Sequence, residues 1–323
     1  MAASRNSLSA DLPERVGAFL AARLGPDDRL TVGLSGGCDS VVLLHLLARL
    51  GCTGRLDAIH VHHGLSANAD AWAQFCTDYC SRLGVPLSIR RVVVNQSPGL
   101  GLEAAAREAR YAAFAETARD CLLLAQHRGD QAETVLFNLL RGAGVTGAAG
   151  MPAERAFGKL RLLRPLLDCS RAEIEAYAAQ VGLSWVDDES NADTSLTRNF
   201  LRHEALAALN PRFPAAEASL AQAARHFGEA AGLLDELAAL DWQQSSESDA
   251  LRLSALKMLS LPRLKNLLRY RLRQLGWQVP VTSRLEEFAR QLQSAGPDRH
   301  PELCLPGGRM RAARGLLHWL PEK

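Results

Sequence analysis

Apolar residues in the first part of the chain follow two alternating patterns. Short apolar runs bounded by Gly, Pro, Asn or Asp indicate buried strands, and the longer stretches between them repeat apolar residues at helical spacing. Strands that alternate with helices are typical of βαβ units, so the pattern predicts an α/β fold with an open, mostly parallel sheet and helices on both faces. Ser170 and Glu173 have the spacing of a capping box, which predicts the start of a further helix. The expected strands are 30–35, 56–62, 87–94 and 121–127, and the expected helices are 39–50, 68–83, 103–119 and 130–141.

The pattern changes at the segment NPRFPAA (210–216), where two prolines indicate a domain boundary. Beyond it, apolar spacing predicts helices at 217–240 and 261–275, and two short strand-like runs flank the Gly307–Gly308 pair. We therefore expect two domains, 1–212 and 213–323, of which the second is smaller and mainly helical.

The composition is that of a globular protein: 47% of the 323 residues are hydrophobic and 22% are charged. No apolar run without a charge approaches the length that a membrane helix needs, and the N-terminus has no signal-peptide core, so we expect no membrane partner. The seven cysteines are odd in number and scattered. This usage predicts reduced thiols and a cytoplasmic location.

Charge is concentrated in one segment of the second domain. Residues 252–273 contain seven Lys and Arg residues and no acidic residue. Such a segment favours an anionic partner such as nucleic acid, although a solvated basic helix face explains the charge equally well.

A glycine-rich loop, Ser35-Gly36-Gly37-Cys38-Asp39-Ser40, joins the first expected strand to the first expected helix. Two glycines let the backbone approach a ligand, and the helix that follows directs free N–H groups and its positive dipole end to the same point. This arrangement binds phosphate. Asp39 would repel a bare phosphate, so its presence predicts a bridging Mg²⁺. The alternative is a tight strand–helix turn, which a Gly-Gly pair alone would favour, but the full string favours phosphate.

The same string resembles the SGGxDS loop of the PP-loop ATP pyrophosphatase superfamily. Four further blocks, at 103–114, 130–144, 162–167 and 185–202, resemble the tRNA(Ile)-lysidine synthetase family in the expected order. The resemblance implies a ligase that uses ATP and Mg²⁺ to adenylate C2 of the wobble cytidine in the CAU anticodon of tRNA(Ile). Free L-lysine then displaces AMP through its ε-amine. It also implies that domain 1–212 is the ATP-binding catalytic domain and that domain 213–323 binds tRNA.

The resemblance assigns roles to individual residues. Asp130 and Glu133 lie three apart at the start of an expected helix and so share one face, where they either bind a substrate ammonium or simply cap the helix. Arg107 would contact phosphate or orient tRNA, or else pair with Glu103 on the helix surface. The resemblance implies that the catalytic residues are Asp39, Asp130, Glu133 and Arg107. It implies that ATP binds to Ser35, Gly36, Gly37, Cys38, Asp39 and Ser40, and that Asp39 binds the metal. The implied substrate-binding residues are Asp130, Glu133, Arg198 and Asn199.

Two departures from the family pattern leave alternatives open. Gly129 stands where the family usually has Asp, and Gln126 where it usually has His. Two alternative functions therefore remain open: an inactive tRNA-binding protein, and another PP-loop enzyme such as a tRNA thiolase. Cys76 and Cys80 lack the paired C-x-x-C spacing of the thiolases that modify cytidine. The oligomeric state is open, a homodimer included.

Overall fold

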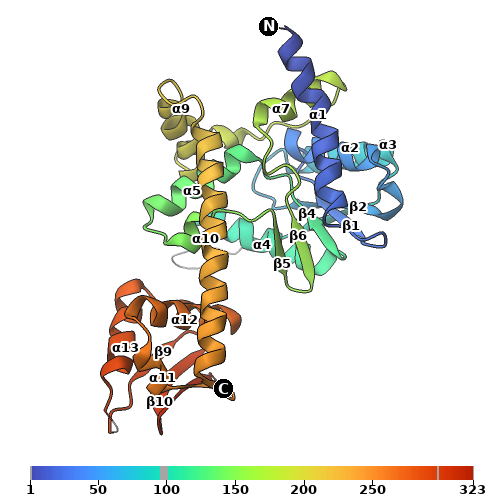
Figure 1. The fold of residues 1–323 in the computed structure, drawn as a ribbon. Coiled ribbons are helices and arrows are strands. Elements are labelled where there is room, and N and C mark those ends of the chain that lie inside the picture. Colours follow the sequence, from blue (N-terminus) through green and yellow to red (C-terminus); the bar gives the residue numbers. More distant parts are fainter. Residues whose placement is uncertain (1, 95–100, 297, 323) are drawn as a thin grey trace. The chain divides into compact units, whose positions relative to one another are not determined.

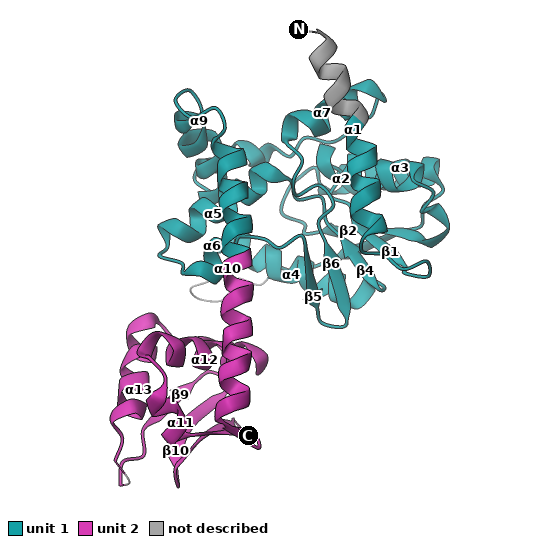
Figure 2. Ribbon diagram, in the orientation of Figure 1, with its two compact units in different colours: residues 1–228 teal, residues 229–323 magenta. Residues whose placement is uncertain are grey.

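The computed structural model describes residues 2–94, 101–296 and 298–322 (Figure 1). The chain divides into two compact units, residues 1–228 and 229–323 (Figure 2). Among the described residues, no helix combines the length and apolar character needed to cross a membrane.

Unit 1 is built on a six-stranded sheet in the order β3-β2-β1-β4-β6-β5. The first five of these strands run parallel, and β5 pairs antiparallel with β6. Leu30 at the start of β1 is in register with Leu56 of β2 on one side and with Cys121 of β4 on the other. The strands are β1 Leu30–Gly33, β2 Leu56–His62, β3 Leu87–Arg91, β4 Cys121–Leu123, β5 Glu154–Phe157 and β6 Leu160–Leu163.

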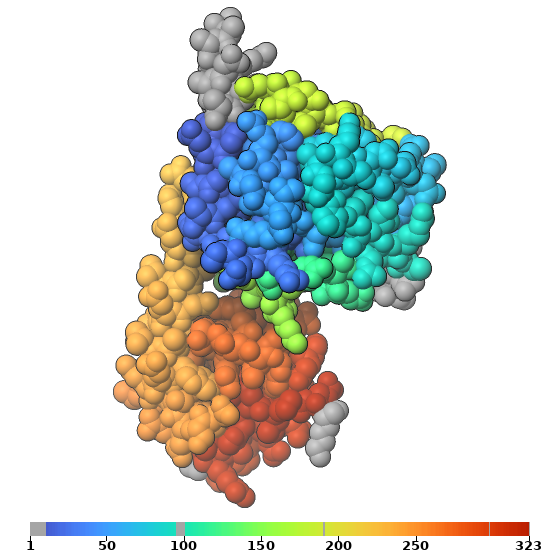
Figure 3. Space-filling model, turned by 90° about the vertical axis from the view of Figure 1, so that its right-hand side faces the viewer, coloured from blue at the N-terminus to red at the C-terminus, as the bar shows by residue number. Residues whose placement is uncertain are grey.

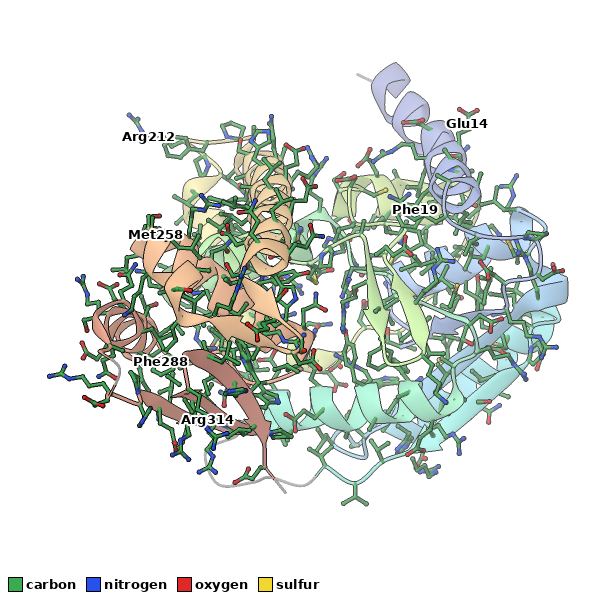
Figure 4. All side chains as sticks on the ribbon, turned by 60° about the horizontal axis from the view of Figure 1, so that its bottom comes forward. Glu14, Phe19, Arg212, Met258, Phe288 and Arg314 are labelled. Carbon is green, nitrogen blue, oxygen red and sulfur yellow. The ribbon has the colours of Figure 1, made fainter. Side chains whose placement is uncertain are left out.

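Helices cover both faces of this sheet, as predicted. On one face α1, α2 and α3 lie side by side (Figures 1 and 3), and their apolar residues form one core with those of α7 and the strands. Phe19, labelled in Figure 4, packs against this core. On the other face Phe114 of α4 packs with Ile59 and Leu122 of the sheet. The helices are α1 Ala2–Ala21, α2 Cys38–Arg49, η1 Thr53–Arg55, α3 Ala69–Leu83, α4 Leu102–Thr117, α5 Arg128–Leu140, α6 Val145–Ala148 and α7 Arg171–Gln180.

The last part of unit 1 is helical and irregular. After η2 (Glu189–Ala192), three helical segments follow one another without a break. The middle one, η3, is a π-helical turn, a form that often occurs at functional sites. These segments are α8 Thr197–Phe200, η3 Leu201–Ala205 and α9 Leu206–Leu209.

The long helix α10, Ala216–Ser245, follows the two prolines that suggested a domain boundary. The two compact units are divided within this helix, after Gly228. The domain limits 1–212 and 213–323 stay a prediction.

Unit 2 combines helices with a five-stranded antiparallel sheet in the order β7-β8-β11-β10-β9. Its core joins four leucines of α12 to apolar residues of α13 and the sheet, including Phe288, which Figure 4 labels. Helix α12 matches the expected helix 261–275, whereas most of the sheet and α13 were not predicted. The elements are β7 Ser246–Glu247, β8 Ala250–Arg252, α11 Leu253–Met258, α12 Leu261–Gln274, α13 Thr282–Ser294, β9 Glu302–Leu305, β10 Gly308–Ala313 and β11 Leu316–Pro321.

Candidate active site

The predicted phosphate loop follows β1 and leads into α2. Ser40, which is 5% exposed, organises it: its Oγ accepts hydrogen bonds from the backbone N–H groups of Ser35 and Gly36, both at 3.2 Å, and donates to the carbonyl oxygen of Gly37 at 2.9 Å. Within the described residues, no side chain caps the N-terminus of α2. The first N–H groups of this helix are therefore available to an anion.

The two loop glycines have different roles. Gly36 has a φ of +93°, and a Cβ there would lie 2.8 Å from Cγ2 of Val186, so the backbone and the packing both demand glycine. Gly37 has an ordinary φ of −71°. A Cβ at Gly37 would meet Ser35 Oγ at 3.5 Å, which is an ordinary contact. The packing therefore leaves room at Gly37 beside the expected phosphate site.

Asp39 lies in the first turn of α2, and its two carboxylate oxygens have different surroundings. Oδ2 accepts a hydrogen bond from Nη1 of Arg171 at 2.6 Å, whereas Oδ1 is buried and has no partner among the described residues. Burial raises the pKa of Asp39, against the lowering effects of His127 and Arg171. A buried carboxylate oxygen without a donor suits a cation, so this site fits the expected Mg²⁺.

Arg171 owes its position to the predicted capping box, which the structure confirms. The Ser170 hydroxyl accepts from the Glu173 N–H at 3.2 Å, and Glu173 Oε2 accepts from the Ser170 N–H at 2.6 Å. The box makes Arg171 the first residue of α7 and directs it to Asp39. The sequence pattern identified the cap but not the ion pair that depends on it.

Cys38 contributes to the loop through its backbone. Its side chain is 2% exposed, and burial raises the pKa of the thiol to about 12, against the lowering effect of Arg171. The thiol is therefore protonated and has no role as a nucleophile at neutral pH.

The N-terminus of α5 contains the two predicted carboxylates and the unexpected glycine. The Gly129 N–H donates to Nδ1 of His127 at 3.0 Å, and Asp130 Oδ2 accepts from the His127 N–H at 2.9 Å, which forms a capping box. A Cβ at Gly129 would lie 2.8 Å from Cε1 of His127. The imidazole therefore fills the space beside Gly129, and Asp130 does cap the helix.

The carboxylate pair has a second partner that the predicted site omitted. Arg202, in the π-helical turn η3, donates from Nε to Glu133 Oε1 at 2.5 Å and from Nη2 to Glu133 Oε2 at 3.1 Å. The same Nη2 donates to Asp130 Oδ1 at 3.1 Å. Burial raises the pKa of Glu133, which is 2% exposed, and the hydrogen bond from Arg202 opposes that shift. Two carboxylates against one guanidinium leave a net negative charge.

Arg202 relates the carboxylate pair to the phosphate loop. It hydrogen-bonds Asp130 and Glu133. Burial lowers the pKa of Arg202, but the charges of Glu133, Asp130 and Asp39 raise it overall. Asp39 follows the carboxyl end of β1 and Asp130 follows that of β4, the edge at which open α/β sheets bind ligands.

The other predicted site residues lie on α4 and α8. Arg107 donates to the Tyr111 hydroxyl at 3.3 Å and lies over the Tyr111 ring. Arg198 is 3.6 Å from Glu103 across these two helices. Asn199 is buried, and its amide donates to the Asp193 carbonyl oxygen at 2.9 Å. Their roles toward substrates stay predictions.

The basic segment 252–273 of unit 2 is largely neutralised within its own unit. Arg263 pairs with Asp241, Lys265 with Glu286, and Arg273 with Asp235. Arg271 lies 3.4 Å from Asp249. The segment therefore has less unpaired positive charge than its sequence indicates, because its acidic partners come from other parts of the chain.

Comparisons with known proteins agree with this arrangement. Residues 9–209 match a family model described as a PP-loop domain, and residues 251–318 match one described as the TilS substrate binding domain. The chain is 46% identical to a tRNA(Ile)-lysidine synthase from Nitrosomonas europaea, over 99% of this chain and 71% of the relative. It is 47% identical to a tRNA(Ile)-lysidine synthase from Pseudomonas fluorescens, over 97% of this chain and 72% of the relative.

A solved structure shares the fold of unit 1 at low sequence identity. The U34-tRNA thiolase NcsA from Methanococcus maripaludis superposes with a TM-score of 0.58 at 18% identity, covering 69% of this chain and 80% of that chain. This likeness shows the fold alone. The family matches and the high identity to curated relatives go further: the chain belongs to the tRNA(Ile)-lysidine synthase family.

Proposed function

We propose that this chain is an ATP-dependent ligase that joins lysine to C2 of the wobble cytidine in the CAU anticodon of tRNA(Ile), forming lysidine. The observation that carries the proposal is the carboxylate pair Asp130 and Glu133 held by Arg202, together with the buried, unpartnered Oδ1 of Asp39 in the first turn of α2. The site thus combines a place for phosphate with a net negative pocket for an ammonium group.

ATP binds in this proposal with its phosphates at the N-terminus of α2. The N–H groups of Cys38, Asp39 and Ser40, in the first turn of α2, would be the donors. Those of Ser35 and Gly36 already donate to Ser40 Oγ, and that of Gly37 donates to Ser35 Oγ, so these bonds hold the loop in place. Asp39 Oδ1 is the atom that would hold Mg²⁺. The ion would supply neutralisation of the phosphate charge. Arg171 neutralises the other oxygen of Asp39 and so favours the approach of a polyanion.

Lysine binds through the carboxylates of Asp130 and Glu133. They hold its α-ammonium group, with Arg202 fixing the direction of both carboxylates. The ε-ammonium first loses a proton to solvent, and the resulting amine attacks C2 of the adenylated cytidine. A C–N bond forms there, the bond from C2 to the AMP oxygen breaks, and AMP leaves. Most of the rate enhancement is expected to come from orientation and charge placement.

The RNA partner is a single-stranded anticodon loop, whose wobble base must leave its stack to reach the site. Unit 2 contains the matched substrate binding domain and is proposed to bind the body of the tRNA. All seven cysteines are unpaired, which fits a reaction in the reducing cytoplasm.

The test is the ATP-dependent incorporation of labelled lysine into a tRNA(Ile) transcript with a CAU anticodon. Asp39→Asn and Asp130→Asn should each reduce incorporation by about a hundredfold or more, because each removes a charge fixed at the reacting groups. Asp78→Asn is the matched control, since Asp78 lies exposed on α3 and accepts a hydrogen bond from the side chain of Gln74. Turnover of ATP without lysine would instead favour a thiolase, and tRNA binding without pyrophosphate release would favour an inactive binder.

A further inference from the structure

A group of arginines surrounds Tyr111 near the candidate site. Burial alone would raise the pKa of the Tyr111 hydroxyl, yet the guanidinium groups around it lower that pKa overall. We call these residues the arginine cluster: Arg107 and Arg110 of α4, Arg155 of β5 and Arg164, which follows β6.

Within the described residues, no member of the arginine cluster forms an ion pair with a carboxylate. Arg164 is 2% exposed, and it donates to neutral acceptors, Gln126 Oε1 at 2.8 Å and the Pro152 carbonyl oxygen at 2.6 Å. Arg155 lies over the rings of Tyr111 and Phe157 and makes no ion pair within the described residues.

Arg110 is the cluster member with the fewest partners. It makes no hydrogen bond or ion pair within the part of the chain that the structure describes, and burial together with Arg107 and Arg198 lowers its pKa. Glu103 is the one acidic residue that opposes this shift, and it already faces Arg198 at 3.6 Å. Residues 95–100, outside the described ranges, read NQSPGL and include no acid. Arg110 is half-buried, and a half-buried guanidinium without a counter-charge among the described residues favours an anion from a ligand.

The arginine cluster lies at the ligand-binding edge of the sheet. Gln126 and Arg164 follow the carboxyl ends of β4 and β6, and His63, which interacts electrostatically with Arg110, follows β2. Nδ1 of His63 is buried and has no hydrogen-bond partner among the described residues. Within the described residues, the Arg110 guanidinium and Nδ1 of His63 therefore have no hydrogen-bond partner at this edge, and a ligand could supply one.

We propose that the arginine cluster binds a backbone phosphodiester of the RNA substrate next to the nucleotide that reacts, with Arg110 as its main contact. The guanidinium fork matches phosphate oxygens, and several cations on one surface suit a strand that passes across it. We assign the phosphate to RNA because, among the described residues, no member of the arginine cluster hydrogen-bonds or pairs with the loop Ser35–Ser40. This inference rests on the proposed function.

The test measures binding of an RNA hairpin with the anticodon stem and loop of tRNA(Ile) to the intact chain by fluorescence anisotropy, at several salt concentrations. Arg110→Gln should weaken binding about tenfold and reduce the slope of log affinity against log salt by about one. Arg119→Gln is the matched control: it removes an arginine beside the amino end of β4, paired with Asp57 at 3.0 Å, and should change neither quantity. Arg110→Lys keeps the charge without the fork and should fall between the wild type and Arg110→Gln.

Two results would overturn the proposal. One is an Arg110→Gln affinity and salt slope equal to those of Arg119→Gln. The other is unchanged RNA binding with weakened binding of ATP, measured by equilibrium dialysis, which would assign the phosphate to ATP. Thermal unfolding of each variant checks the fold, and Arg110→Lys replaces Arg110→Gln if the latter does not fold. Failure of the proposed function is distinguishable, since the wild type would then bind the hairpin through Arg110 yet incorporate no lysine.

Discussion

Arg202 holds Glu133 with two hydrogen bonds, from Nε to Oε1 and from Nη2 to Oε2, although the two residues are 69 positions apart in the chain. Arg202 is 36% exposed and Glu133 is 2% exposed, so the arginine pairs with a buried carboxylate from its solvent side. This relationship joins the π-helical turn η3 to α5 and makes the site dependent on both.

We expect Arg202→Met to destabilise unit 1 by about 2–3 kcal/mol, because it leaves the Glu133 carboxylate buried and unpaired; partial exposure of Arg202 limits the loss. Denaturant unfolding of the intact chain measures the change. The double variant Glu133→Gln/Arg202→Met should recover most of the loss, and Arg198→Met, which breaks a longer contact with Glu103, should cost less than about 1 kcal/mol. Equal losses for Arg198→Met and Arg202→Met would contradict the pairing.

The two loop glycines should respond differently to alanine. Gly36→Ala places a Cβ 2.8 Å from Val186 at a φ of +93°, so we expect a loss of about 1–3 kcal/mol in stability together with loss of ATP binding. Gly37→Ala should fold normally, because its Cβ meets only an ordinary contact, and should weaken ATP binding alone. Thermal unfolding and equilibrium dialysis with ATP separate the two effects. A normal melting temperature for Gly36→Ala would show that the loop relaxes.

His63 should make stability depend on pH. Burial, with Arg110, His60 and His62, lowers the pKa of His63 from 6.5 to about 4. Above pH 6.5 the imidazole is neutral in both the folded and the unfolded state. As the pH falls from 6.5 to about 4 the unfolded state takes up a proton that the folded state refuses, so stability is lost, by up to about 3 kcal/mol.

The comparison variant for this titration is His63→Gln. The difference in free energy of unfolding between wild type and His63→Gln should grow in favour of the wild type as the pH rises from about 4 to 6.5. Denaturant unfolding at a series of pH values provides the two curves. Parallel curves would mean that His63 titrates normally in the folded protein.

Thiol reactivity should single out one cysteine. Cys304 is exposed and the other six cysteines are buried, and burial raises the pKa of Cys76 to about 12 and of Cys169 to about 11. Only the Cys304 thiol should therefore react quickly with a disulfide reagent such as DTNB near neutral pH. Cys304→Ser should remove the fast phase of the reaction. Unfolding in guanidinium chloride should make the six buried thiols reactive. A second fast thiol in Cys304→Ser would show that one of the cores opens.

The sequence predicted β1, β2 and β4 of unit 1 well because these strands are largely buried and bounded by turn residues, whereas β3 is an exposed edge strand. Strand β2 matches its expected range, 56–62, and α2 begins at Cys38, one residue before its expected start. Strand β5, Glu154–Phe157, was not expected, because its exposed edge position allows a polar composition. In unit 2 the strands β7 and β8 are too short to show a period of their own. Helix α13 does have helical apolar spacing, at Leu285, Phe288, Ala289 and Leu292, which the sequence prediction did not use.

The candidate site was predicted where local spacing determines geometry, as at Ser35–Ser40 and at the pair Asp130 and Glu133. The residues that the predicted site omitted, Arg171 and Arg202, reach it from segments far along the chain. Their basic side chains have no periodicity that marks them out, and only the fold brings them to their carboxylates. Arg202 had one signal, its place at the end of the block 185–202 that resembles the family.

The hydrogen bonds of the Ser40 hydroxyl affect the rate at which ATP can bind. The hydroxyl ties the loop to itself before any nucleotide arrives, through bonds to Ser35, Gly36 and Gly37. Ordering of this loop is then complete in the free protein, and binding of ATP carries little of that entropy cost. Binding of ATP should therefore show a single kinetic phase at a rate limited by diffusion. Any slower conformational change should accompany binding of the RNA instead.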